Sequence, residues 1–189
     1  MSGPALAAIE MQSIARGYLA LDAAAKRSDV RVIRSEPITP GKYWLALEGG
    51  EAEVDESLQA AISTAGGSRI DHVNLAYVHP VVLEAVRTSS VAHGVLDSIG
   101  AVEVGSICAA IRAADAALKA ADVSLVDLHL ARGIGGKGYL VVSGSLSSVE
   151  ASVEAAVEAA GALWLVGKEV LANPDRVLGS AVHHRRAER

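Results

Sequence analysis

The chain has 189 residues, of which 51% are hydrophobic and 21% are charged, so it is long and apolar enough to bury a core. This composition excludes a disordered or low-complexity protein. With 17 basic and 22 acidic residues the net charge is −5, and an acidic chain without a basic stripe is a poor candidate for binding nucleic acid. The single cysteine, Cys108, excludes a disulfide framework and a CxxC metal site within one chain.

Two further properties concern location and association. The first residues carry no basic, apolar signal segment, and no apolar run approaches the roughly 20 residues that span a bilayer. We therefore expect a soluble, intracellular protein that does not bind membranes. Aromatic residues make up 3% of the chain and Phe is absent, so the apolar fraction consists largely of small side chains. Such a core offers few large anchors, which favours stabilisation by oligomerisation.

The chain contains an internal repeat. Residues 8–30 and 101–123 align at a shift of 93, with 11 of 23 positions identical. After a change of two residues in length the alignment resumes, and Gly41-Lys42 then matches Gly136-Lys137. Two units of about 90 residues indicate duplicated domains, because the units of a solenoid are shorter.

The first copy predicts strands at 6–11, 30–35, 43–47 and 72–77, with helices at 13–27 and 53–65. In the second copy the strands are expected at 99–104, 123–130, 139–142 and 162–170. Ser106 is the expected N-cap of a helix that reaches residue 118, and a second helix covers 148–160 and is closed by Gly161. Three glycines within residues 133–136 predict a turn, and residues 87–94 are expected to be the linker.

The order strand–helix–strand–strand–helix–strand is that of a ferredoxin-like α+β unit, an antiparallel sheet with two helices on one face. We expect a first domain at residues 4–88, a second domain at 95–181 and a basic tail at 182–189. This architecture hosts many functions and does not decide among them.

Several motifs resemble the shell-protein domain of bacterial microcompartments. They are the opening AxExxS, the helix end DAAxKxxDV, the glycine-bearing loop before the third strand, and the final strand ending near His79-Pro80 or Asn173-Pro174. Over roughly residues 5–180 the chain resembles the tandem-domain members of this family, most of all the propanediol-utilisation type. The resemblance implies two tandem shell domains in an unpermuted order. It also implies that three chains form a pseudohexameric, disc-shaped trimer.

The resemblance further implies that the glycine-bearing loops of all three chains meet around a central pore. The candidate pore-lining residues are Thr39, Pro40, Gly41, Ile134, Gly135 and Gly136. Six loops converging on one axis must be slim, which favours glycine and backbone amides as the lining. An ordinary hairpin turn is the alternative for residues 133–136. A dinucleotide-binding loop is excluded because a strand, not a helix, follows.

Lys26 and Lys119 occupy equivalent positions near the ends of the first helix of each copy. The resemblance implies that they lie at the disc edge as assembly contacts, against a lysine of the neighbouring disc. A long aliphatic stem with a terminal donor suits that role. The alternative is a solvated lysine that favours the helix dipole.

Other candidate residues favour structural roles. Glu10 and Glu103 precede a helix and are expected to satisfy backbone donors, since no nucleophile or histidine recurs beside them. The histidines are scattered, so no metal site is expected. Cys108 aligns with Ala15 and is expected to be a core residue. The iron–sulfur member of the most similar type carries a cysteine in its first pore loop, where this chain has Thr39, so no cofactor is expected.

We therefore predict a non-enzymatic structural protein located in a microcompartment shell. Its trimers would tile into facets, and its pore would pass small polar metabolites. The expected partners are two further copies of the chain, other shell proteins that form hexamers and pentamers, and encapsulated enzymes. The alternative is a small-molecule or metal-binding sensor built on duplicated ferredoxin-like domains. The sequence does not favour an enzyme with its site between the two copies, because no triad, metal cluster or phosphate loop supports it.

Overall fold

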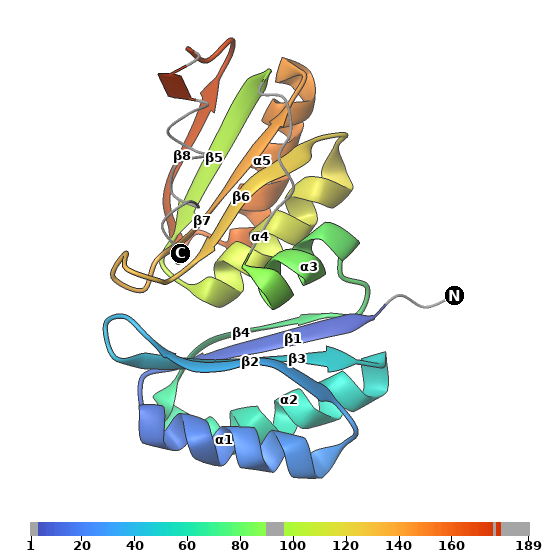
Figure 1. Cartoon of the computed structure of the whole chain (residues 1–189), viewed down its shortest axis with the longest axis vertical. Coiled ribbons are helices and arrows are strands. Elements are labelled where there is room, and N and C mark those ends of the chain that lie inside the picture. The colour runs from blue at the N-terminus through green and yellow to red at the C-terminus, as the bar shows by residue number, and fades with distance from the viewer. Residues whose placement is uncertain (1–3, 90–96, 176, 179–189) are drawn as a thin grey trace.

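The computed structural model describes residues 4–89, 97–175 and 177–178, and it folds each repeat around a four-stranded antiparallel sheet (Figure 1). The first domain consists of β1 (Ala5–Met11), α1 (Ile14–Arg27), β2 (Arg31–Ile38), β3 (Lys42–Gly49), α2 (Glu51–Ala65), the short 3-10 helix η1 (Gly66–Ser68) and β4 (Arg69–Leu75). After α3 (Pro80–Thr88), the second domain consists of β5 (Ser98–Val104), α4 (Ile107–Ala120), β6 (Ser124–Leu130), β7 (Gly138–Gly144), α5 (Leu146–Ala160) and β8 (Leu165–Leu171).

The two sheets repeat each other down to their irregularities. Their strand orders are β2-β3-β1-β4 and β6-β7-β5-β8. In the first sheet the register between β1 and β4 shifts after Glu10, and in the second sheet the register between β5 and β8 shifts after Glu103. Such bulges re-aim the strand locally, so the repeat conserves the backbone path as well as the residue pattern. The predicted ferredoxin-like α+β architecture is confirmed.

Local sequence signals set the helix ends, as predicted for Ser106 and Gly161. The Ser13 and Ser106 side chains each accept a hydrogen bond from the backbone N–H three residues later, which satisfies an otherwise free donor of the first turn. Gly161 ends α5 with a φ of 80°, a conformation that glycine adopts without steric cost.

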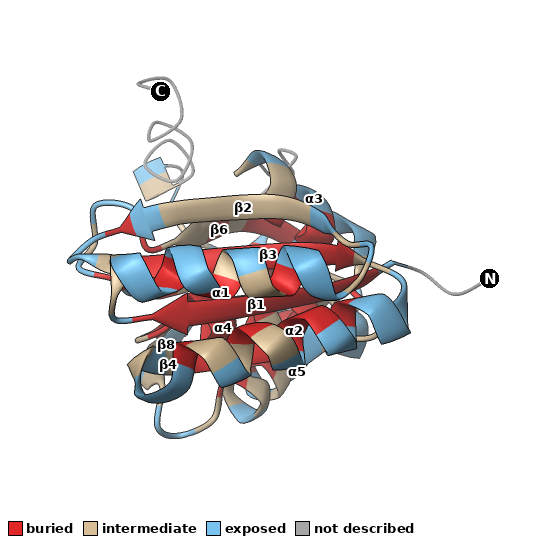
Figure 2. Ribbon diagram, turned by 90° about the horizontal axis from the view of Figure 1, so that it is seen from below, coloured by how far each residue is buried: buried red, intermediate tan, exposed pale blue. Residues whose placement is uncertain are grey.

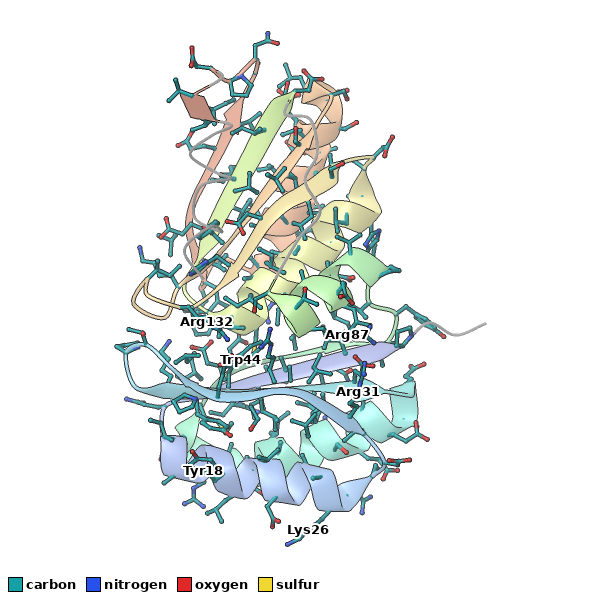
Figure 3. All side chains as sticks on the ribbon, in the orientation of Figure 1. Tyr18, Lys26, Arg31, Trp44, Arg87 and Arg132 are labelled. Atoms are coloured by element: carbon teal, nitrogen blue, oxygen red, sulfur yellow. The ribbon has the colours of Figure 1, made fainter. Side chains whose placement is uncertain are left out.

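The core of the second domain continues into the first. In the first domain, α1 and α2 cover one face of the sheet. The opposite face is covered by α4 and α3, so that α4 lies between the two sheets (Figure 1). Trp44 points from the first sheet toward the second domain and is 2% exposed (Figure 3). By contrast, the outer face of α1 is exposed (Figure 2).

The helix α3 is the main element that the sequence analysis missed. His79 caps it and Pro80 begins it, and its buried face packs against β2 and α4. Arg87 makes two hydrogen bonds of 2.6 Å to the Glu48 carboxylate of β3. The expected linker therefore begins too early, because Arg87 and Thr88 belong to this helix. Its residues 90–94, and the basic tail at 182–189, lie outside the described residues.

Candidate pore and assembly surfaces

The two predicted pore loops lie side by side within one chain. The β2–β3 loop and the β6–β7 loop project at the same end of the molecule (Figure 1). A Cβ atom on Gly136 would lie 2.9 Å from the Thr39 carbonyl oxygen and 3.1 Å from Cδ of Pro40. Gly136 also has a φ of 82°, so only glycine allows the two backbones to approach this closely.

The six predicted pore residues differ in exposure. Thr39, Pro40, Gly41 and Gly135 are exposed, Ile134 is half-buried, and Gly136 is buried between the loops. The structure therefore brings both triplets together and leaves the loop tips open to solvent. The tips present small side chains and backbone amides.

An ion pair joins the bases of the two loops. The Arg132 guanidinium, which precedes the second loop, donates hydrogen bonds of 2.9 and 3.0 Å to the two carboxylate oxygens of Glu36 (Figure 3). Both oxygens bond the same nitrogen, Nη2, so the partly exposed pair joins the loop bases without the two parallel hydrogen bonds of a forked arginine–carboxylate contact. This contact was not predicted, although opposite charges stand just before both loops in the sequence.

Glu10 connects the first pore loop to the second domain. Its side chain is fully buried, and Oε1 accepts a hydrogen bond of 2.7 Å from Nζ of Lys42, just after the loop. Its Oε2 accepts a hydrogen bond of 2.9 Å from the backbone N–H of Ile107, the first residue of α4. Burial raises the pKa of the Glu10 carboxyl, and Lys42 opposes this shift. The expected role at a backbone donor is correct, but the donor belongs to the other domain.

The equivalent group in the second domain has a different environment. Glu103 accepts a hydrogen bond of 2.7 Å from Nζ of Lys137, but its side chain is 43% exposed. It lies beside a pocket of about 370 Å³ on the open face of the second sheet. The pocket is lined by Ala101, Val102, Glu103, Tyr139, Gly167, Lys168 and Glu169.

A second polar cluster holds α4 on the first sheet. The Asp71 carboxylate accepts a hydrogen bond of 3.1 Å from Arg112 Nη2 and one of 2.5 Å from the Ser106 hydroxyl. Arg112 also donates a bond of 3.1 Å to the carbonyl oxygen of His72. Since Asp71 is largely buried, this charge pair is part of the contact between the domains and not a solvated surface bridge.

The two predicted edge lysines have unequal surroundings. Lys26 is exposed and pairs with Asp22 on its own helix at 2.7 Å. Lys119 pairs with Asp115 at 2.6 Å and also donates a hydrogen bond of 2.5 Å to the carbonyl oxygen of Tyr77, between β4 and α3. Lys119 therefore takes part in the contact between the domains, whereas Lys26 has no such contact in the part of the chain that the structure describes.

Other chemistry is sparse. Cys108 is fully buried in α4, and burial raises the pKa of its thiol well above the usual value. Because this is the chain's one cysteine, neither pore loop supplies thiolates for an iron–sulfur cluster. Among the described residues no cluster of His, Cys, Asp and Glu could hold a metal ion. Within the same residues, no helix combines the length and hydropathy needed to cross a membrane.

Two tandem α+β domains with adjacent glycine-bearing loops place the chain in the class of proteins built from a duplicated ferredoxin-like domain, and known proteins of similar sequence identify the family. The family model of the BMC domain matches the sequence at residues 5–80 and 98–174. The chain is 40% identical to the bacterial microcompartment shell protein PduT of Citrobacter freundii over 172 residues, which are 90% of this chain and 92% of that protein.

Solved structures show the same likeness. A microcompartment protein from Desulfitobacterium hafniense DCB superimposes with a TM-score of 0.82 at 36% identity, over 94% of this chain and 98% of the other. The fused permuted hexameric shell protein MSM0275 shares the fold, with a TM-score of 0.64 and 24% identity over 83% of both chains.

The chain belongs to the BMC-domain family of bacterial microcompartment shell proteins. The predicted structural role and the predicted location in a microcompartment shell are confirmed. The family is structural, in agreement with the expectation of a non-enzymatic protein. The sensor alternative receives no support from these relatives.

Proposed function

We propose that three copies of this chain close into a ring whose six loops surround a central pore. The observation that carries this proposal is a surface that occurs twice. The α4 side chains Arg112 and Asp115 make polar contacts with the first domain. Their counterparts on α1 are Leu19 and Asp22, which are exposed.

The complementary surface is also exposed. In the first sheet, the face opposite α1 and α2 is covered by α4. The equivalent face of the second sheet carries the pocket beside Glu103. A surface on one end that fits a different surface on the other end forms a heterologous contact, which generates a ring when the rotation closes. Three chains then contribute six domains to that ring.

Such a ring would place the two adjacent loops of each chain around its axis. Thr39, Pro40 and Gly41 would alternate with Ile134, Gly135 and Gly136. The lining would combine glycines, backbone amides and the Thr39 hydroxyl with the side chains of Pro40 and Ile134. A narrow opening of this composition favours small polar metabolites, because the amides and the hydroxyl offer hydrogen bonds.

At the rim, we propose that Lys26 and Lys119 contact other shell components, so that trimers tile into facets beside hexamers and pentamers. Encapsulated enzymes would then lie behind the shell. The decisive measurement is the particle mass in solution by native mass spectrometry or sedimentation. We expect about 58 kDa, three times the chain mass of 19.4 kDa. A stable monomer at micromolar concentration and physiological salt would contradict the proposal.

A further inference from the structure

We infer that Glu103 of one copy caps helix α1 of the next copy, by accepting a hydrogen bond from the backbone N–H of Ile14. This inference rests on the proposed ring. It assigns to Glu103 a partner that the single chain does not supply, and it names the second copy as the occupant of the pocket on the second sheet.

The same kind of contact is already present within one chain. Glu10 holds Lys42 through one carboxylate oxygen and the Ile107 N–H through the other. This arrangement places a negative charge at the N-terminus of α4, where the helix dipole and a free donor both favour it. Its burial shows that the contact is closed to solvent.

The two halves of the chain are equivalent at the residues that make this contact. In the repeat, Glu103 takes the place of Glu10, Lys137 that of Lys42, and Ile14 that of Ile107. The strand register is the same, since Glu10 faces Asp71 of β4 and Glu103 faces Gly167 of β8. Glu103 therefore has the same backbone setting as Glu10 and the same lysine partner.

Glu103 and Ile14 are the two groups that this contact would join. Glu103 binds Lys137 through Oε1, while Ile14 begins α1 beside its N-cap, Ser13. In the part of the chain that the structure describes, no acceptor is recorded for the Ile14 N–H. A carboxylate oxygen and a helix donor are thus available on the two surfaces that the ring would join.

The surrounding surface specifies the chemistry of the contact. Where Arg112 pairs with Asp71 inside the chain, the equivalent residues between chains are Leu19 and Gly167. Tyr18 and Leu19 are more than half exposed on α1, and the pocket that would receive this helix includes Ala101 and Tyr139. The contact between chains therefore lacks the arginine–aspartate pair, and the apolar side chains of α1 would meet a pocket whose lining also includes Lys168 and Glu169.

A double-mutant cycle tests the cap at its donor. Proline is well suited to the first position of a helix and removes the N–H, so Ile14→Pro deletes the donor while keeping α1. Ser13 has φ −107° and ψ 121°, which is compatible with a following proline. Ile14→Ala is the matched control, because it removes the side chain and keeps the donor. Each variant is made with Glu103 intact and with Glu103→Ala.

The readout is the concentration at which half of the trimer dissociates, from sedimentation or mass photometry. We expect Glu103→Ala to raise this concentration roughly tenfold or more, since each ring loses three caps. Glu150→Ala, an equal charge change on the exposed side of α5, should leave it unchanged. Ile14→Pro should dissociate the ring more than Ile14→Ala when Glu103 is present. The two should be equal once Glu103 is removed.

A result in which Ile14→Pro dissociates the trimer more than Ile14→Ala by the same factor, with Glu103 intact and with Glu103→Ala, would contradict the cap but not the ring. Glu103→Ala trimers that dissociate like the unmodified protein would also overturn the cap alone. Absence of any trimer in the unmodified protein would overturn the ring and the cap together. Circular dichroism of Ile14→Pro confirms that the helix content is retained.

Discussion

Glu10 of β1 accepts a hydrogen bond at 2.9 Å from the backbone N–H of Ile107, which lies 97 residues later in the chain. The other oxygen of the same carboxylate holds Lys42, the residue after the first pore loop. One buried side chain therefore couples the position of that loop to the position of α4. Because α4 also carries Arg112, the domain contact and the loop geometry are fixed by the same set of charges.

Arg112 provides a direct test of the domain contact. We expect Arg112→Leu to lower the free energy of unfolding by about 3 kcal/mol, because Asp71 is left largely buried without its cation. The double variant Asp71→Ala/Arg112→Leu should lose less than the single variant, since it removes the orphaned charge. Chemical denaturation followed by tryptophan fluorescence measures both. An equal or larger loss in the double variant would show that the ion pair adds net stability.

The contact between Glu48 of β3 and Arg87 of α3 should weaken in acid. Its burial raises the pKa of this carboxyl, but hydrogen bonds from Arg87 and Arg31 outweigh burial and leave the pKa below its ordinary value. A lowered folded-state pKa means that the stabilisation is present above the ordinary pKa of about 4.3 and is lost as the pH falls through the folded value.

The measurement is the difference in thermal unfolding between the unmodified chain and Glu48→Gln at each pH. We expect the difference to be largest near neutrality and to shrink below about pH 4.3. Taking a difference is necessary because the pKa of Glu10 is shifted in the opposite direction to that of Glu48. Its raised pKa makes its contribution decline as the pH rises through the folded value. A difference that is constant down to pH 3 would contradict the assignment to Glu48.

The repeat explains how much of this structure was predictable. Both sheets, their helices and the caps at Ser13 and Ser106 follow from local patterns that occur twice. The helix α3 was missed because it occurs between the copies, although Pro80 after the capping residue His79 and an apolar face were available signals.

The contacts between the domains could not be predicted in the same way. Glu10 was correctly assigned to a backbone donor, but the pattern around it points to its own helix and not to α4. Likewise, Asp71 and Arg112 have no charged counterparts at Gly167 and Leu19, so the repeat gave no indication of their pairing. Contacts of this kind depend on how the two domains are placed, which local sequence does not encode.

Gly135 and Gly136 form a matched pair for testing the apposition of the loops. Both have positive φ angles, of 68° and 82°, so an alanine at either position carries a similar backbone strain. Only Gly136 faces the first loop, with the Thr39 carbonyl oxygen 2.9 Å from an added Cβ, whereas nothing lies within 4 Å at Gly135. We expect Gly136→Ala to cost roughly 1–3 kcal/mol more than Gly135→Ala in chemical denaturation. Equal costs would show that the loops separate easily.

Of the two predicted edge lysines, Lys26 allows the simpler mutational test. Its partner Asp22 lies on the same helix and both are exposed, so Lys26→Asp should not disturb the fold. Lys119→Asp would instead lose the bond to Tyr77 and place its carboxylate beside Asp115, which is buried, whereas Asp22 is exposed. We expect Lys26→Asp to leave the trimer mass unchanged and to abolish sheets or tubes in electron micrographs, because a repeated repulsion outweighs a small edge contact. Sheets of normal extent would mean that Lys26 is merely solvated.

Thr39 tests the pore directly, because its exposed side chain would face two symmetry copies across the axis. Replacing it with cysteine places three thiols in one small ring, while Cys108 stays fully buried and apart. We expect mild oxidation of Thr39→Cys to link two of the three chains, seen as a dimer band on a non-reducing denaturing gel. The unmodified protein is the control and should remain a single-chain band, since burial protects Cys108 and raises the pKa of its thiol. If intact Thr39→Cys trimers do not cross-link, residues 39–41 lie away from the axis, and the 134–136 loop alone would remain as the pore lining.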